Sequence, residues 1–235
     1  MKKILLVVSM FFMTAISANA ALIGLDEGSF TPAASVITFS EYALGTVNPS
    51  YSFDIDGSIY DVTFDGYFAG GLGTPTVGSP LALAAGSPDT FISTDGANPT
   101  SPVLSGTPRF SGSVAVLFSQ DVAAVGLDGG YFDAIGGTTI AAYDRMGNLL
   151  GSITNSAMGI EFFGLGDSSG EAVIAGIQFY ITGNEPAGYA IDNLTFAIDE
   201  GGYNPNPDAV PEPATMFLLG AGLLGGVVSR KRKKN

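Results

Sequence analysis

The sequence predicts an all-β protein, an antiparallel β-sandwich placed between a signal peptide and a short membrane-spanning tail. Three observations predict this class. The middle of the chain holds short segments rich in β-branched and aromatic residues, turn residues such as Gly, Asn and Asp separate them, and no stretch there shows the roughly 3.6-residue apolar period of an amphipathic helix. Among sandwiches and barrels we expect a jelly roll, because its strands are short and numerous.

The first 20 residues have the features of a secretory signal peptide. Two lysines precede an apolar run over residues 4–16, and a small-x-small site follows at Ala18 to Ala20. This order of charge, apolar run and small residues is typical of a signal peptide rather than of a buried core helix. We therefore expect Sec-type machinery to export the chain and signal peptidase to cleave it between Ala20 and Ala21.

The exported part of the chain is strongly acidic. All 22 Asp and Glu residues lie between residues 21 and 213, where Arg109 and Arg145 are the only basic residues, so the formal charge of this span is −20, the difference between the two counts. Such a field repels phosphate backbones and anionic head groups, which excludes nucleic acid as a partner. Cations, basic proteins and neutral glycans are compatible with it.

Several residue types that carry common chemistry are absent from the sequence. The chain has no His, no Cys and no Trp, which excludes Ser-His-Asp and Cys-His mechanisms and removes the usual ligands of zinc and redox metals. Without disulfides, the exported part must be stabilised by a hydrophobic core. We predict a protein that is not an enzyme. The one mechanism that this composition could carry alone is glycoside hydrolysis by a pair of carboxylates.

Ten segments of the exported part, which we place at residues 21–203, are predicted as strands. Turn residues separate them, and Asp56-Gly57 is typical of a two-residue hairpin. The prolines of residues 70–108 instead predict a long surface excursion, with one short strand at residues 90–92. The ten predicted strands are residues 36–41, 51–55, 58–68, 111–119, 122–127, 138–144, 148–154, 159–164, 172–182 and 189–198.

Two carboxylates are candidate metal ligands. Strand alternation places Asp192 on the same face as Leu194, and Glu41 on the same face as Phe39, so both acids would lie on apolar faces. A buried carboxylate is costly unless it is paired, hydrogen-bonded or bound to a metal, and calcium prefers oxygen ligands. We hypothesise that Glu41 and Asp192 share a Ca²⁺. Alternatively, Asp192 accepts backbone N–H bonds or a bulge turns it outward. A calorimetric titration without calcium uptake at millimolar concentration would exclude the metal.

The C-terminal segment differs from everything before it. Residues 214–229 are uncharged and mostly apolar, and a helix of that length spans about 24 Å against a hydrocarbon core of about 30 Å. Long basic side chains after it can reach the head groups and keep the tail, residues 230–235, in the cytoplasm. We predict a transmembrane helix over 214–229, preceded by a stiff Pro-rich spacer over 204–213. The basic residues that stop the span are Arg230, Lys231, Arg232, Lys233 and Lys234.

The order of motif, apolar span and basic cluster over residues 210–235 resembles the PEP-CTERM sorting signal, whose tail is sometimes labelled an ice-binding-protein C-terminal domain. The resemblance implies that Pro211, Glu212 and Pro213 are recognised by an exosortase, a membrane transpeptidase-like enzyme that removes the tail. It also implies a Gram-negative, exopolysaccharide-producing source. The exported part more loosely resembles the jelly-roll domains that such proteins carry, which implies a fold rather than an activity.

The predicted function follows from these features together. We expect the chain to be anchored in the inner membrane before processing and then to reach the cell envelope, the surface or the extracellular exopolysaccharide matrix of a biofilm. There the sandwich would act as a structural component. The alternative is a lectin-like module that binds glycans through its tyrosines, with or without calcium. A carboxylate-pair glycosidase is a third reading of the same acidic surface.

Overall fold

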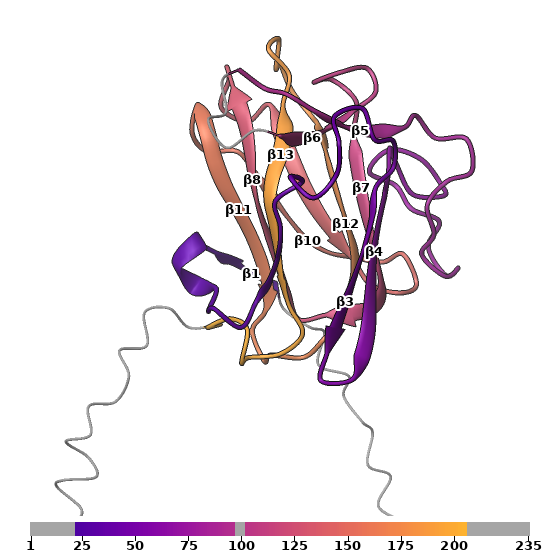
Figure 1. The fold of residues 1–235 in the computed structure, drawn as a ribbon, viewed down its shortest axis with the longest axis vertical. Coiled ribbons are helices and arrows are strands. Elements are labelled where there is room, and N and C mark those ends of the chain that lie inside the picture. The colour runs from indigo at the N-terminus through magenta and orange to yellow at the C-terminus, as the bar shows by residue number, and fades with distance from the viewer. Residues whose placement is uncertain (1–21, 97–101, 206–235) are drawn as a thin grey trace, which may run out of the picture.

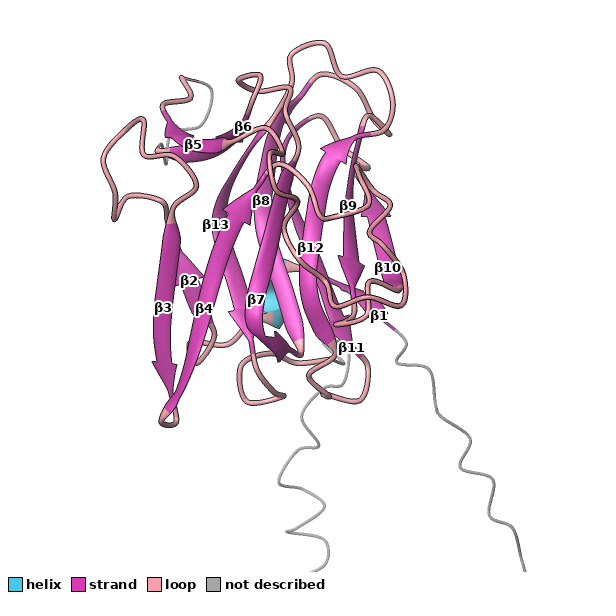
Figure 2. Cartoon of the chain, turned by 90° about the vertical axis from the view of Figure 1, so that its right-hand side faces the viewer, coloured by secondary structure: helices cyan, strands magenta, loops and turns pink. Residues whose placement is uncertain are grey.

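The computed structural model describes residues 22–96 and 102–205. Two antiparallel sheets stack face to face as a β-sandwich, which confirms the predicted all-β class (Figures 1 and 2). One three-residue 3-10 helix, η1 (Glu27–Ser29), is the only helix in these two ranges. No helix among the described residues is long and apolar enough to cross a membrane. The predicted signal peptide, the transmembrane helix at 214–229, the basic tail and most of the spacer lie outside the described residues.

The first sheet has seven strands and includes both the opening and the closing segments of the described chain. β2 (Ser35–Ile37) pairs antiparallel with β13 (Ala190–Ala197), with Ile37 opposite Leu194, so the first and last of the predicted strands are neighbours. In spatial order the strands are β1 (Leu22–Leu25), β11 (Gly159–Asp167), β8 (Ala124–Phe132), β13 (Ala190–Ala197), β6 (Val103–Gly106) and β5 (Thr90–Ser93), with β2 (Ser35–Ile37) also paired to β13.

The second sheet has six strands. A two-residue turn joins β3 to β4 as predicted, because Asp56 and Gly57 both adopt positive φ, at 52° and 80°, which suits the twist of a tight hairpin. Asp54 secures the turn by accepting a hydrogen bond from the Gly57 N–H at 3.0 Å. In spatial order the strands are β10 (Leu149–Thr154), β9 (Thr138–Tyr143), β12 (Ile174–Ile181), β7 (Val114–Val122), β4 (Ser58–Asp65) and β3 (Ser50–Ile55).

The main hydrophobic core fills the space between the two sheets. Phe163 of the first sheet packs edge-to-face against Phe179 of the second, with ring centroids 5.1 Å apart, and Phe118 contacts Phe196 at 5.4 Å. Such interlocked aromatic rings bury large apolar areas, which is the main source of stability for a chain without disulfides. The core therefore meets the requirement set by the absence of Cys.

The Pro-rich segment is more closely integrated into the fold than the sequence predicts. Residues 90–93 form the expected strand, β5, but β5 pairs with β6, which we did not predict and which joins the central strand β13. Leu81 of the segment and Phe68 just before it cover the outer face of the second sheet around Tyr143. Only parts of residues 70–108 are thus a surface excursion.

Both ends of the described chain lie at one end of the sandwich. Leu22 of β1 is opposite Asp167, and the Tyr203 hydroxyl donates a hydrogen bond to the Asp167 carbonyl at 2.5 Å. Figure 1 shows both chain ends there, whereas β5 and β6 lie at the opposite end.

Candidate functional site

The candidate site is the open side of the sandwich between β2 and β3, which we call the seam. Two grooves lie along it. The Tyr42 groove has a volume of about 590 Å³ and is lined by Val36, Glu41, Tyr42, Ser50, Tyr51, Ser52 and Phe53. The Asp199 groove has a volume of about 340 Å³ and is lined by Ala33, Ser35, Ile55, Asp56, Phe196, Ala197, Ile198, Asp199, Gly201 and Gly202.

A half-exposed aromatic ring forms one wall of the Tyr42 groove. Tyr42 is 41% exposed, and its hydroxyl donates a hydrogen bond to the Ser50 carbonyl at 2.7 Å. Its ring meets the Tyr51 ring edge-on, with centroids 5.2 Å apart. Because the hydroxyl and one ring edge are fixed, the remaining ring surface is a preformed platform for an apolar ligand face.

The buried polar group of the Tyr42 groove is the Tyr51 hydroxyl. It is buried and makes no hydrogen bond among the described residues. Burial, and then the nearby negative charge of Glu41, raises the pKa of Tyr51 above its usual range. An unpaired buried hydroxyl costs free energy, so this group lowers the stability of the groove wall.

The phenylalanine pair beneath the seam connects the two grooves. Phe53, which lines the Tyr42 groove, packs edge-to-face against Phe196, which lines the Asp199 groove, with centroids 5.1 Å apart. At the far side, Asp199 accepts a hydrogen bond from the Gly201 N–H at 2.7 Å. The grooves therefore share an aromatic floor, and each is lined by at least one carboxylate.

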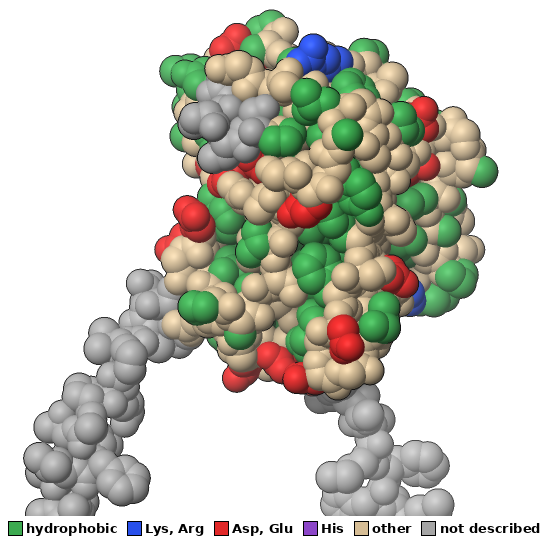
Figure 3. Space-filling model, viewed as in Figure 1, with side chains coloured by type: hydrophobic (Ala, Val, Ile, Leu, Met, Phe, Trp, Pro, Cys, Tyr) green, Lys and Arg blue, Asp and Glu red, His purple; other side chains and the backbone are tan. Residues whose placement is uncertain are grey.

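The seam offers hydrogen-bond acceptors but no positive charge. Among the described residues, no Lys or Arg lines either groove, whereas Glu41, Asp56 and Asp199 do. On the face shown in Figure 3, acidic side chains lie around an area of hydrophobic and uncharged side chains. Such a site favours ligands rich in hydrogen-bond donors and disfavours anions.

The structure corrects the predicted position of Glu41. Strand β2 ends at Ile37 rather than at residue 41, because the buried Phe39 adopts a positive φ of 56° and turns the chain. Glu41 is consequently exposed on a turn, where it accepts hydrogen bonds from the Thr38 N–H and hydroxyl at 3.2 and 2.9 Å. It does not extend the apolar stripe of β2.

Asp192, in contrast, is buried at 1% exposure. Its Oδ1 accepts a hydrogen bond from the Asn193 N–H at 2.8 Å, and in the strand register it lies opposite Asp128 of β8. The register shifts after Asp192, where Asn193 has a φ of 48° and donates from its side chain to Asp128 at 2.8 Å. The described residues contain no group of three acidic side chains that could hold a metal ion. The calcium hypothesis for Glu41 and Asp192 therefore stays a prediction.

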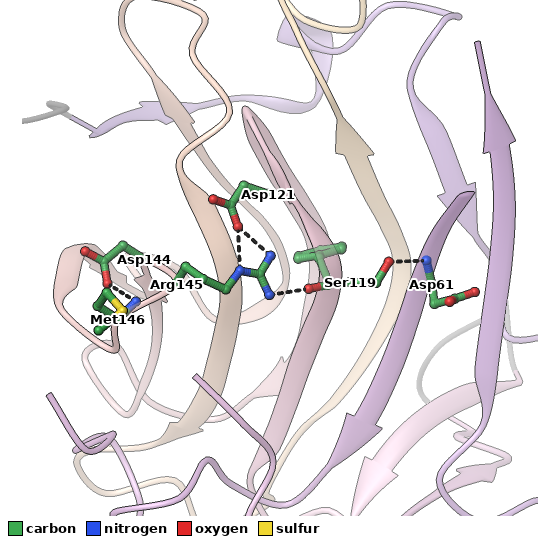
Figure 4. Close-up of polar contacts among 7 residues, drawn as sticks. Asp61, Ser119, Asp121, Asp144, Arg145 and Met146 are labelled. Atoms are coloured by element: carbon green, nitrogen blue, oxygen red, sulfur yellow. Dashed lines mark hydrogen bonds and ion pairs between the residues drawn. The ribbon is translucent and has the colours of Figure 1, made fainter. Parts of the chain in front are cut away.

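The ion pair between Arg145 and Asp121 has a structural role away from the seam. Arg145, at the turn between β9 and β10, contacts the Asp121 carboxylate through two nitrogens and donates to the Phe118 carbonyl at 2.8 Å (Figure 4). Asp144 caps the same turn by accepting from the Met146 N–H at 2.8 Å. These contacts attach the β9–β10 turn to the end of β7.

Sequence reasoning identified neither Tyr42 nor Tyr51 as a site residue. The alternation in Tyr51-Ser52-Phe53 indicates a strand, but it does not show which sheet edge lies beside it. The turn after β2 brings the Tyr42 hydroxyl to the Ser50 carbonyl, and the sequence does not show this contact either. The seam is therefore a feature that only the folded chain displays.

The fold and the seam place the described residues in the class of acidic antiparallel β-sandwich domains. In the C-terminal segment, residues 209–233 match the family model of the PEP-CTERM protein-sorting motif. The chain is thus a PEP-CTERM motif-containing protein, as the resemblance predicted. The motif implies an exported protein of the surface or envelope that an exosortase processes.

Comparison with solved structures gives only remote similarity. The K2 cleaved adhesin domain of Lys-gingipain is 12% identical, with a TM-score of 0.33 over 70% of this chain and 99% of that domain. A family 11 carbohydrate-binding module from Clostridium thermocellum, in complex with a β-1,3-1,4-mixed-linked tetrasaccharide, is 13% identical, with a TM-score of 0.29 over 70% of this chain and 95% of the module. No curated protein matches the chain. Similarity at this level supports no inference about ligand or activity.

Proposed function

We propose that this protein is an exported structural component of the bacterial envelope or exopolysaccharide matrix, delivered there by its C-terminal tail. The sorting motif at residues 209–233 is the observation that carries the proposal. In this proposal the jelly-roll sandwich is held by a transmembrane helix at residues 214–229 until an exosortase removes the tail. Signal peptidase acts first, at Ala20.

The geometry of the sandwich supports delivery by a C-terminal tail. The described chain ends at residue 205 beside β1, at the end of the sandwich opposite β5 and β6 (Figure 1). A spacer attached there leaves the opposite end of the domain, with β5 and β6 (Figure 1), accessible outside the membrane. The domain also carries too few basic residues to adhere to anionic head groups by itself.

The test is exosortase-dependent processing in a host that has the enzyme. Replacing Pro211, Glu212 and Pro213 together by Ala should leave an unprocessed precursor in the membrane and remove the protein from the extracellular matrix fraction. Pro207→Ala, in the spacer but outside the three-residue motif, is the matched control and should be processed like the wild type. Equal processing of the triple variant, detected by mass spectrometry of the C-terminus, would contradict the proposal.

A second candidate function is glycan binding, which the Tyr42 groove favours. The fixed ring of Tyr42 and the carboxylate of Glu41 combine an apolar platform with a polar group that can fix a sugar's orientation. This role is compatible with a structural one, since a matrix component can be held by the matrix polymer. Calcium dependence and glycosidase activity stay predictions without a further observation in their favour.

A further inference from the structure

We propose that the whole seam is a single track that binds a glycan chain without anionic groups along its length. This inference rests on the glycan-binding role proposed above. It adds the path of the ligand, which crosses both grooves, and the charge class of the ligand. The position of the two grooves supports the path, and the charge of their lining supports the charge class of the ligand.

Continuity of the two grooves supports the path. Successive residues of β2 border the two grooves, Ser35 the Asp199 groove and Val36 the Tyr42 groove, and their side chains point to opposite faces of the strand. On the opposite side, Phe53 and Ile55 of β3 divide between the two grooves in the same way, and as alternate residues they point to one face of the strand. The same two strands thus form both walls, and the grooves follow each other along the seam.

The length of the seam suits an extended polymer. The six residues of β3 span about 20 Å at about 3.3 Å per residue. Both grooves border this strand, so a ligand that touches both must be elongated. A chain of several sugar units meets this condition, whereas a monosaccharide or disaccharide can occupy only one groove.

The chemistry of the lining suits a sugar chain. Val36 is 45% exposed and Tyr42 is 41% exposed, so apolar surface is available for the ring faces of sugars. The carboxylates of Glu41, Asp56 and Asp199 can accept hydrogen bonds from the hydroxyl groups that every sugar unit carries. The apolar faces and hydroxyl groups of a sugar chain therefore find both apolar and acceptor groups in the lining of the seam.

The charge of the seam selects against acidic glycans. Each groove contributes at least one carboxylate and no basic residue lines either groove among the described residues. The exported part as a whole carries a formal charge of −20. A glycan of uronic acids would bring further negative charge into this field, so its binding is opposed at every unit. A neutral glycan meets no such opposition.

The experiment is isothermal titration of the full chain, purified in detergent, with neutral glucose oligosaccharides from disaccharide to hexasaccharide and with uronic-acid oligosaccharides of equal length. We expect the neutral hexasaccharide to bind at least about tenfold more tightly than the disaccharide, a difference of about 1.4 kcal/mol. We expect no binding of the uronic-acid series at low salt, where repulsion is strongest.

Three variants separate a track from a single groove. Tyr42→Ala should weaken all neutral oligosaccharides. Ala33→Gln, which places a larger uncharged side chain at an exposed position of the Asp199 groove, should weaken the hexasaccharide about tenfold and leave the disaccharide unchanged. Tyr131→Ala removes another exposed aromatic side chain, 49% exposed and outside the seam, and should change neither. Thermal unfolding of each variant shows whether the fold is retained.

Each other outcome contradicts a defined part of the inference. If no glycan binds, both the glycan-binding role and the track are wrong. If the disaccharide binds as tightly as the hexasaccharide, or if Ala33→Gln changes nothing, the track is wrong while glycan binding stands. Equal binding of the uronic-acid series would overturn the charge class. A dimer in sedimentation that Tyr42→Ala abolishes would assign the seam to a second copy of the chain instead.

Discussion

Buried tyrosine hydroxyls in this sandwich fall into two groups. The hydroxyl of Tyr189 lies 2.8 Å from the carbonyl oxygens of both Gly112 and Phe179, in the centre of the fold. The hydroxyls of Tyr143 and Tyr51 are also buried but have no hydrogen-bond partner in the described part of the chain. Tyr51 lines the Tyr42 groove with other atoms, whereas the Tyr143 ring packs edge-to-face against Phe68. The same kind of atom is therefore stabilising or costly according to its surroundings.

Removing single hydroxyl groups tests this distinction. Tyr189→Phe should destabilise the protein by about 1–3 kcal/mol, because buried carbonyl oxygens lose their partner. Tyr143→Phe is the matched control, since it removes a buried hydroxyl that satisfies nothing, and it should be neutral or stabilising. Urea unfolding followed by tyrosine fluorescence measures both. An equal loss of stability in the two variants would show that the hydrogen bonds of Tyr189 contribute nothing specific.

At the scale of elements, close backbone contacts position the loop that leads into β13. Gly188 adopts a φ of 77°, and a Cβ added there would lie 1.8 Å from the Phe110 carbonyl oxygen. The next residue, Tyr189, donates its N–H to that same oxygen at 2.7 Å. The turn before β13 is therefore fixed against the segment after β6, and only glycine leaves room for this approach.

Two glycine variants test the close contact between Gly188 and the Phe110 carbonyl. Gly188→Ala should destabilise the protein by more than about 3 kcal/mol, because the Phe110 carbonyl must move and its bond to Tyr189 is strained. Gly136→Ala is the control, since its φ of 79° is nearly the same but no atom lies within 4 Å of the added Cβ. It should cost only about 1–2 kcal/mol of backbone strain. Thermal unfolding that gives equal losses for both would contradict the close contact.

For the whole molecule, stability depends on aromatic burial in a strongly acidic chain. Tyr143 and Tyr203 belong to separate core clusters, each beside the main one. Burial, and then the neighbouring Tyr180, raises the pKa of Tyr143 to about 12. Burial, followed by the charges of Asp167 and Glu200, raises the pKa of Tyr203 to about 12. Burial likewise raises the pKa of Tyr189.

The raised pKa values of the buried tyrosines predict that the protein loses stability at alkaline pH. Each tyrosine holds its proton more tightly in the folded state than in the unfolded chain, where the pKa is about 10. The stability that they contribute is complete below pH 10 and declines as the pH rises from about 10 to 12, because the unfolded chain releases protons first. Urea titrations at pH 9 and pH 11 should therefore show a lower midpoint at pH 11. An unchanged midpoint would mean that the tyrosines ionise equally in both states.

At the candidate site, the sequence predicted the strand but not the turn that follows it. Alternation correctly indicated a strand beginning near Val36, but it could not show that Phe39 turns the chain through a positive φ to fill the core against Tyr51 and Phe64. That turn moves Glu41 out of the predicted apolar stripe and onto the rim of a groove. Propensity is a local preference, and here the filling of the core decides the conformation instead.

The sequence by itself determined the properties that depend on composition and local order. The absence of His and Cys, the charge of the exported part, the all-β class and the sorting motif at residues 209–233 all follow from which residues are present and in what order. The tertiary structure alone decided that β2 and β3, which belong to different sheets, border a common seam. Contacts between sheets depend on how side chains from distant segments pack, and no local pattern contains that information.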